Sequence, residues 1–300
     1  MASTYSAICT IVYLECEEAY KIVDREKMSA YLRKLKHNVD TVTDPGKECS
    51  KARTTVPGSF QIHINGENDM RAIYCSLVVA EVLNLLEPEL TKGIGDYIAS
   101  CQTYEGGIAC VPYGEAHAGY TYCGLASLLI INETHKIDLN TLLEWSVNRQ
   151  IAIEGGFNGR INKFVDSCYN FWQGSIAELA DIALHGTANY QGEWLYNQRA
   201  IQGYTLLCCQ GEKGGLVDKP SKGVDLYHTC YSLAGLSIVQ AKSAYKKLYV
   251  EKEFEGKNDA SLSAMLGGEI MNKVGRVHPL YNLQHEKVEK AKKYFYSLSK

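Results

Sequence analysis

Four long apolar segments recur along the chain and alternate with shorter amphipathic ones. The long segments span residues 71–86, 118–131, 165–184 and 225–241, and the shorter ones fall near 91–101, 139–150 and 194–209. Apolar residues in the long segments recur at spacings of three and four, and Ala and Leu are frequent, which predicts helices rather than strands. The six prolines lie outside these segments and dipeptides typical of β-hairpins are scarce, which agrees with an all-α chain.

A short polar run that closes on glycine precedes each long segment. The glycines stand at positions 58, 106, 155 and 214, and three of the runs contain Gly-Gly (CQTYEGGIA, NRQIAIEGGF and CCQGEKGGL). Gly-Gly supplies the positive φ that is needed where the chain leaves a helix. The pattern predicts repeats of about 50 residues with two helices each, in an inner and an outer layer. Such an array either stays an open solenoid or closes into a ring.

Two stretches depart from the repeat, and neither marks a second domain. Residues 37–56 (HNVDTVTDPGKECSKARTTV) are polar and aperiodic, which is typical of a surface insertion. Residues 251–275 are similar but less polar. We therefore expect residues 1–300 to form a single domain with a polar insertion at 37–56.

Composition excludes several classes of protein. A net charge of −3 with 22% charged residues argues against a nucleic-acid or other polyanion binder. No apolar run approaches the roughly 18 residues of a transmembrane helix, and the N-terminus lacks a signal-peptide pattern. The eleven cysteines are odd in number, lie mostly among apolar residues and include no CxxC pair. They indicate buried thiols in a reduced, cytoplasmic chain rather than a disulfide scaffold or a zinc ribbon.

The segment EGGFNGRINKFVDSCYNFW (154–172) contains candidate metal ligands. Asp166 and Cys168 stand two residues apart, so their side chains converge only if Asp166 caps a helix and Cys168 lies in its first turn. His228 opens another predicted inner helix, and carboxylate, thiolate and imidazole together suit zinc with one coordination position left open. From residue types alone, a helix cap and a buried thiol are the simpler explanation.

Cations and aromatic residues surround these candidates. His117, Arg160 and Lys163 stand at the mouths of two predicted helices, where positive side chains can hold phosphate, although solvated loop charges explain them more simply. A polar cluster near His228, more simply an ordinary loop, contains Asp218, Lys219 and Lys222. The lining of a hydrophobic tunnel, or a core stripe, would comprise Arg71, Tyr74, Tyr120, Tyr169, Trp172 and Tyr227.

These stretches together resemble the β subunits of protein farnesyltransferases. The resemblance rests on EAHAGYTYCGLASL, GGFNGRINKFVDSCYNFW, GGLVDKPSKGVDLYHTCYSLAGLS and VHPLYNLQHEKVEKAKKYF. It implies an α/α barrel (toroid) of two concentric helical layers with a central active site, docked on a helical-repeat α subunit. It also implies transfer of the farnesyl group of farnesyl diphosphate to the cysteine of C-terminal Cys-a-a-X sequences.

The resemblance also implies roles for the matching residues. One Zn²⁺ would be bound by Asp166, Cys168 and His228, and Mg²⁺ use would involve Asp218. The catalytic groups around the diphosphate would be His117, Arg160, Lys163 and Tyr169. The prenyl chain and the peptide would lie against Tyr5, Arg71, Tyr74, Ala118, Gly119, Tyr120, Cys123, Trp172, Lys219, Lys222 and Tyr227.

The chain departs from the family pattern at two places, and two alternatives stay open. It is expected to lack upstream barrel helices that carry tryptophans in the family, and the 37–56 insertion is extra. The β subunit of type I geranylgeranyltransferase has the same fold and metal, but Tyr227 before His228 and the bulky Tyr5 near the tunnel floor favour farnesyl. A non-catalytic toroid that binds partners through its rim is the other alternative, and the complete ligand and cation sets speak against it.

Overall fold

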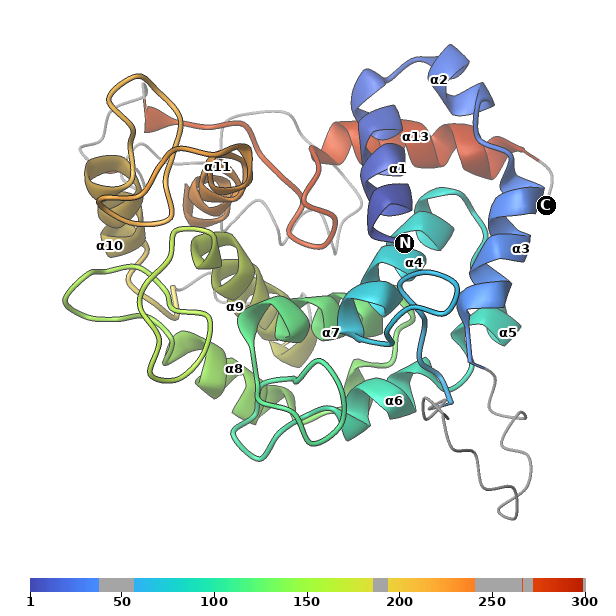
Figure 1. Ribbon diagram of the computed structural model, residues 1–300, viewed down its shortest axis with the longest axis horizontal. Helices are drawn as coiled ribbons and strands as arrows, with labels where there is room; N and C mark the ends of the chain where they lie inside the picture. Colours follow the sequence, from blue (N-terminus) through green and yellow to red (C-terminus); the bar gives the residue numbers. More distant parts are fainter. Residues whose placement is uncertain (38–56, 186–193, 241–265, 267–271, 299–300) are drawn as a thin grey trace.

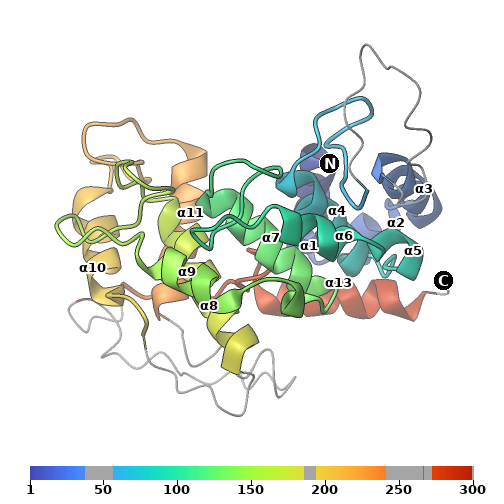
Figure 2. The same ribbon diagram turned by 90° about the horizontal axis from the view of Figure 1, so that it is seen from below.

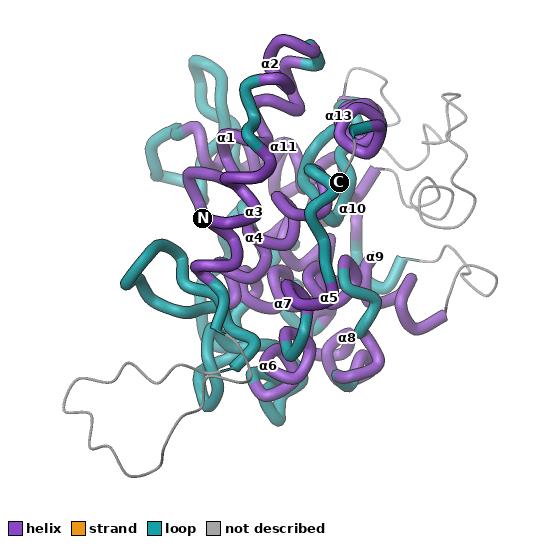
Figure 3. Tube along the Cα trace, turned by 90° about the vertical axis from the view of Figure 1, so that its right-hand side faces the viewer, coloured by secondary structure: helices purple, strands orange, loops and turns teal. Residues whose placement is uncertain are grey.

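The computed structural model describes residues 1–37, 57–185, 194–240, 266 and 272–298. Within these residues the regular structure is helical, with isolated β-bridges and no strand (Figure 3). The expected insertion at 37–56 lies outside the described residues except for His37, and so does most of 251–275. The all-α prediction is confirmed.

Four long helices follow one another around an arc (Figure 1): α4 (Met70–Val82), α7 (Ala118–Ile130), α9 (Tyr169–His185) and α11 (Leu226–Gln240). Each packs against the next, and α1 (Ala2–Leu14) packs against α4. Helices α4, α7 and α9 are buried on nearly every side. This burial explains why the segments are apolar throughout rather than along one stripe. They are the inner layer that the sequence predicts.

Shorter helices form the outer layer, each against one inner helix. Helices α3 (Arg25–Leu35), α6 (Ile94–Ser100), α8 (Leu139–Val147) and α10 (Gln198–Gly203) pack on α4, α7, α9 and α11 respectively. A π-helical turn at Tyr204–Cys208 continues α10. Near the two ends of the chain, α13 (His285–Ser297) packs against α1, α4 and α2 (Glu17–Lys21) (Figure 2). Helices α1, α3 and α13 lie outside the glycine-marked repeat, so the repeat did not predict them.

Some helix boundaries differ from the predicted segments. The segment 165–184 was expected to be helical throughout, but α9 begins only at Tyr169. An antiparallel bridge between Asn158 and Val165 keeps the preceding residues extended. The segment 91–101 is also broken, since Gly93 adopts a positive φ between α5 (Pro88–Thr91) and α6.

In two of the glycine turns, a glutamine side chain hydrogen-bonds both to the turn and to the start of the next outer helix. This arrangement is called a glutamine clamp below. The Gln102 amide donates to the carbonyls of Gly106 (2.9 Å) and Asp138 (2.8 Å), and its Oε1 accepts from the Asp138 N–H. Gln150 makes the same three bonds with Gly155 and Asn197. Asp138 and Asn197 are the N-caps of α8 and α10, so each clamp fixes where the next outer helix begins.

Only glycine fits in these turns. Gly106 has φ +104°, and a Cβ there would overlap the carbonyl oxygen of Thr141 in the first turn of α8. The glycine therefore permits both the left-handed backbone and the close approach to the outer helix.

The starts of three inner helices, α4, α7 and α9, are tied to the loop of the following repeat. The N–H of Met70 donates to the Cys110 carbonyl at 3.2 Å, and the N–H of Ala118 donates to the Gly159 carbonyl at 2.8 Å. Ahead of α9, the N–H of Ser167 donates to the Asp218 carbonyl at 2.9 Å. Because the same connection recurs, the N-terminal ends of the inner helices lie together along one edge of the arc.

The glutamine clamps should contribute measurably to stability. Replacing Gln150 with Ala removes three hydrogen bonds and leaves main-chain groups unpaired, so we expect a loss of about 1–3 kcal/mol in the free energy of unfolding. Chemical denaturation monitored by circular dichroism measures this loss.

Gln210 provides the matched control. It stands at the corresponding place in the last glycine turn, but its amide donates to the Leu206 carbonyl within its own segment. Gln210→Ala should change the unfolding free energy by less than about 0.5 kcal/mol. Equal losses for the two variants would contradict the clamp.

Candidate active site

Polar side chains cap the inner helices at the edge where their N-termini gather. Asp69 accepts from the N–H groups of Arg71 and Ala72 at the start of α4, and His117 caps α7. Asp225 accepts from the His228 N–H at 2.7 Å at the start of α11. Each cap satisfies N–H groups that a helix leaves unpaired, and it also places a titratable group at the same edge.

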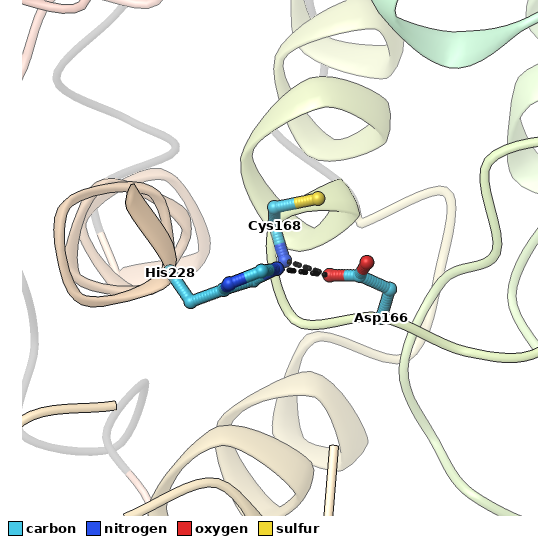
Figure 4. Close-up of side chains that lie close together, drawn as sticks. All are labelled: Asp166, Cys168 and His228. Atoms are coloured by element: carbon cyan, nitrogen blue, oxygen red, sulfur yellow. Dashed lines mark hydrogen bonds and ion pairs between the residues drawn. The ribbon is translucent and has the colours of Figure 1, made fainter. Parts of the chain in front are cut away.

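Asp166, Cys168 and His228 form a compact cluster between α9 and α11 (Figure 4). Their ligand atoms all lie within 4.8 Å of one another. Asp166 Oδ1 accepts from the Cys168 N–H at 2.9 Å and lies 3.3 Å from His228 Nε2. The sequence predicted this convergence, but it placed Cys168 inside a helix. Both Asp166 and Cys168 instead precede α9, in the turn that leads into it.

The donor set of this cluster fits a divalent transition metal. The Cys168 thiol is buried, and burial together with the neighbouring Asp166 carboxylate raises its pKa far above the ordinary value. A cation between the three groups would reverse this effect and favour the thiolate. Carboxylate, thiolate and imidazole are the ligand types that zinc accepts.

Asp225 is a site residue that the sequence analysis missed. Its Oδ2 lies 2.6 Å from His228 Nδ1, so that nitrogen carries the proton and Nε2 is left to face Asp166 and Cys168. A carboxylate behind a metal-binding imidazole holds the ring in this way in many metal sites. The hydrogen bonds to His228 lower the pKa of Asp225. The available signal was an Asp three residues before the His, which is the spacing of a helix cap.

Ser167, which stands between Asp166 and Cys168, holds this turn in place. The residue is buried, and its hydroxyl donates to the Val217 carbonyl at 2.7 Å and accepts from the Ser232 hydroxyl at 2.8 Å. The two bonds tie the turn before α9 to the next loop and to α11. The turn before α9 and α11, which carry the cluster, are therefore fixed to each other and to the loop at Val217.

Next to this cluster, His117, Tyr169 and Arg160 form a second polar group. Tyr169 follows Cys168 by one residue, and its hydroxyl lies 3.1 Å from His117 Nε2. Gly159 makes the contact possible, because a Cβ at that position would overlap the Tyr169 ring. The Arg160 guanidinium forms an ion pair with Glu115, a residue that the sequence analysis did not single out.

His117 has a defined tautomer and a lowered pKa. Its Nδ1 accepts from the Gly119 N–H at 3.1 Å, so Nε2 carries the proton and can donate. Burial and the nearby Arg160 cation lower the pKa of His117. A neutral imidazole donor, a phenol and a guanidinium beside the N-terminus of α7 make a site suited to an anion.

Other expected charges lie farther from this group. Lys163 is exposed in the loop closed by the Asn158–Val165 bridge. The Lys219 ammonium forms an ion pair with Asp218, so that carboxylate is already engaged by a cation. Lys222 is exposed on the same loop.

Aromatic rings from five helices form a continuous series, here called the aromatic wall. In order, the wall consists of Tyr5 (α1), Tyr74 (α4), Tyr122 (α7), Trp172 (α9), Tyr231 and Tyr227 (α11). Successive ring centroids lie 5.6, 5.3, 5.0, 4.4 and 4.7 Å apart. The sequence analysis named four of these residues but missed Tyr122 and Tyr231, which were not distinguishable from ordinary core tyrosines.

The wall ends beside the Asp166–Cys168–His228 cluster, and the His117–Tyr169–Arg160 group flanks it. Tyr227 packs edge-on against His228, with ring centroids 5.1 Å apart. Tyr120 lies between the His117 ring and the Arg71 guanidinium, whose central carbon is 5.9 Å from the Tyr120 centroid. Ala118 and Cys123 are buried on the same helix, α7, and Gly119 gives its N–H to His117.

Comparison with known proteins agrees with this architecture. Residues 1–283 match the family described as the prenyltransferase alpha-alpha toroid domain. The chain belongs to this family.

Individual members are similar over much of the chain. The "Protein farnesyltransferase subunit beta" of Pisum sativum is 34% identical over 99% of this chain and 78% of its own length. The protein of the same description from Arabidopsis thaliana is 37% identical over 80% of this chain and 57% of its own length. A solved structure, "Candida albicans protein geranylgeranyltransferase-I complexed with GGPP", has a TM-score of 0.60 at 20% identity and covers 92% of this chain and 69% of that chain. The predicted toroid fold and the family resemblance are confirmed.

None of the described helices of this family member is both long and apolar enough to span a membrane. The ten cysteines among the described residues are free thiols. The expected burial holds for five of them, Cys75, Cys101, Cys123, Cys168 and Cys209, whereas Cys16, Cys208 and Cys230 are exposed.

The contact between Gly159 and Tyr169 can be tested directly. Gly159→Ala should push the Tyr169 ring away from His117 and lower the free energy of unfolding by about 1–3 kcal/mol, because it overpacks a close contact. Thermal unfolding gives the change in stability, and the NMR shifts of the His117 ring report its lost partner.

Gly223→Ala is the control for a loop glycine, since a Cβ at Gly223 meets no atom within 4 Å. It should leave both measurements unchanged. The same stability loss in both variants would show that the Tyr169 contact is unimportant.

Proposed function

We propose that this chain is the catalytic β subunit of a zinc-dependent protein farnesyltransferase. It would transfer the farnesyl group from farnesyl diphosphate to the cysteine thiolate of proteins that end in Cys-a-a-X. The observation that carries the proposal is the juxtaposition of the Asp166–Cys168–His228 cluster with the His117–Tyr169–Arg160 group at one end of an aromatic wall. Thiolate, diphosphate and prenyl chain thus each have a matching surface.

Asp166, Cys168 and His228 would hold Zn²⁺ and leave one position for the sulfur of the substrate. Zinc bound there would lower the pKa of the substrate thiol, so that the thiolate would be present at neutral pH. Asp225 keeps the Nε2 lone pair of His228 directed at Asp166 and Cys168. Ser167 holds the turn that carries Asp166 and Cys168 against α11.

The cation group would bind the diphosphate and stabilise the charge that it gains. As the C–S bond forms, the bond between farnesyl C1 and the bridging oxygen breaks and its electron pair goes to the diphosphate. His117 Nε2–H, the Tyr169 hydroxyl and Arg160 are donors that face this charge, which is electrostatic stabilisation of the transition state. Lys163 would approach from its exposed loop once the anion is present, and Arg160 would exchange Glu115 for the diphosphate.

The aromatic wall, which includes Tyr74 and Trp172, would bind the prenyl chain together with the neighbouring Arg71, Tyr120 and Cys123. The proposal favours farnesyl over geranylgeranyl because the similar proteins of Pisum sativum and Arabidopsis thaliana are both named protein farnesyltransferase subunits. Tyr5 is the first ring of the wall, and a bulky ring there would shorten the space left for a longer prenyl chain.

A helical α subunit and Cys-a-a-X proteins would be the partners of this chain. The substrate peptide would pass Tyr227, which is half exposed beside the metal cluster, and the loop with Lys219 and Lys222. Asp218 would serve Mg²⁺ only after Lys219 leaves its carboxylate. Prenyl transfer by the chain co-expressed with an α subunit, with farnesyl and geranylgeranyl diphosphate both supplied, tests the whole proposal.

The metal assignment predicts one zinc ion per chain. Cys168→Ala should lose most of the bound zinc and most of the transfer activity, because a thiolate ligand of the ion is missing. Elemental analysis by mass spectrometry counts the metal.

Cys16→Ala, which removes an exposed thiol at the start of α2, should keep both zinc and activity. Full zinc retention in Cys168→Ala, or wild-type protein without zinc, would refute the assignment.

The lowered pKa of His117 predicts that diphosphate binding depends on pH. A bound anion favours the imidazolium, so it raises the pKa of His117 and binding takes up a proton. Affinity for the prenyl diphosphate should therefore rise as the pH falls through the pKa of the bound state. Isothermal titration calorimetry at several pH values measures this slope.

His117→Gln keeps a donor but cannot be protonated, so the part of the slope due to His117 should disappear. The ionisation of the diphosphate itself is common to both proteins and cancels in the comparison. Affinity at low pH should fall by about tenfold to a hundredfold with the loss of a charge-assisted bond. If affinity depends on pH with the same slope in both proteins, the anion binds at a position away from His117.

A further inference from the structure

Two buried serine hydroxyls join α11 to the turn before α9. The Ser232 hydroxyl donates to Ser167 Oγ at 2.8 Å, and the Ser167 hydroxyl donates to the Val217 carbonyl at 2.7 Å. Both serines are fully buried. The two bonds therefore run from α11, through the residue between Asp166 and Cys168, to the loop that leads into α11.

Packing alone does not account for serine at these two positions. Alanine would fill nearly the same space, and a buried hydroxyl costs free energy unless it finds a partner. Here each hydroxyl donates one directed hydrogen bond, and hydrogen bonds in series strengthen one another. Two serines bonded to each other fix the distance and the direction between their segments, which two alanines would not do.

One face of α11 carries both a candidate ligand and the buried serine. His228, Ser232 and Gly235 follow one another at spacings of four and three residues, so they lie on the same face of the helix. A Cβ at Gly235 would lie 2.9 Å from the Cβ of Asn170 in the first turn of α9. This face of α11 therefore contacts residues 166–170 at three successive places.

The start of α11 has little other burial to hold it. Most residues of its first turn are exposed, and Ser232, one turn beyond His228, is the first buried residue of the helix. Asp225 fixes the ring of His228, but it belongs to the same repeat as α11. The position of His228 relative to Asp166 and Cys168 therefore depends on the contacts along the shared face.

We propose that Ser167 and Ser232 are positioning residues for the Asp166–Cys168–His228 cluster. Their hydrogen bond sets the height and rotation of α11 at which His228 Nε2 faces the other two ligands. Because a site that is assembled in advance loses less freedom when an ion binds, this bond raises metal affinity without touching the ion. The inference rests on the proposed zinc binding and adds the residues that couple the ligand on α11 to the two before α9.

The test measures the zinc affinity of the complex with an α subunit, by competition with a chelator of known affinity. Ser167→Ala removes both bonds, so zinc affinity should fall by about tenfold or more. A purely structural role would lower the melting temperature of the metal-free protein and leave zinc affinity unchanged.

Co²⁺ in place of zinc gives a spectroscopic readout of the same variant. At saturating Co²⁺, the absorption from the Cys168 thiolate to the metal should remain in Ser167→Ala. The visible bands of a four-coordinate ion should weaken, because His228 no longer holds its place and the coordination geometry changes. The visible bands of the wild-type complex in Ser167→Ala would contradict the inference.

Ser232→Ala is a milder variant, and it serves if Ser167→Ala does not fold. It removes the bond between the serines but keeps the bond from Ser167 to Val217, so zinc affinity should fall by about threefold to tenfold. Adding Ser232→Ala to Ser167→Ala should cause no further loss of affinity, because the shared bond is already absent.

Ser146→Ala is the matched control. Ser146 is also fully buried, but its hydroxyl donates to Gln173 Oε1 at 2.7 Å and so joins α8 to α9. It should lower the melting temperature of the metal-free protein to a similar extent and leave zinc affinity unchanged. An equal loss of zinc affinity in this control would show that the loss follows from destabilisation in general, and it would overturn the inference.

Unchanged zinc affinity in Ser167→Ala, or in Ser232→Ala if that variant is used instead, also overturns the inference, as does a further loss in the double variant. A wild-type complex that binds no zinc overturns the proposed metal site instead, so the two failures are distinguishable.

Discussion

The site depends on one recurring constraint, the hydrogen bond from the starts of α4, α7 and α9 to the loop of the next repeat. These bonds join Met70 to Cys110, Ala118 to Gly159 and Ser167 to Asp218. They bring together N-terminal ends of helices that are some 50 residues apart in sequence. Because each helix start already needs a cap, the same positions carry Asp69, His117 and Asp225 with no additional element. The residues that cap the inner helices are therefore also the residues that place titratable groups at the candidate site.

The repeat explains how much of the fold could be predicted from sequence. Glycines at a regular interval and apolar segments with helical spacing identify α4, α7, α9 and α11, since those signals are local. The terminal helices α1 and α13 lack the glycine marker and depend on contacts with each other and with α4. The start of α9 was wrong by four residues, because a bridge between Asn158 and Val165 competes with the helix.

Residue types and the family resemblance predicted only part of the candidate site. Asp166, Cys168 and His228 do converge, as expected. The supporting residues Asp225, Ser167 and Glu115 were missed, because their importance comes from partners in other repeats. Tyr122 was missed for the same reason: in the sequence it is one of twenty-one tyrosines, and only its hydrogen bond to the Pro279 carbonyl distinguishes it. The catalytic roles of individual residues stay predictions.

The properties of the two polar groups also explain why a metal ion and an anion would bind side by side. Burial keeps the Cys168 thiol and the His117 imidazole in their neutral forms as long as no opposite charge is near. A cation at the first group and an anion at the second would each favour the charged form of its neighbours, and the two bound charges would attract each other across Tyr169. Tyr169 is therefore placed to report on both, since it follows Cys168 and hydrogen-bonds to His117.

The two ends of the aromatic wall differ in their surroundings. The end at Tyr227 is built from helix starts and loops, where one substitution changes a ligand or a charge. The other end is built from helix interiors and the turn at Pro279 and Leu280 that accepts from the Tyr122 hydroxyl, where rings and carbonyls are buried and rigid. Tightly packed apolar ends discriminate by volume at a cost of about 1–3 kcal/mol for overpacking, while charged ends discriminate by chemistry. Both kinds of group are nevertheless held by the same helices, because Asp69 caps α4, which carries Tyr74, and His117 caps α7, which carries Tyr122.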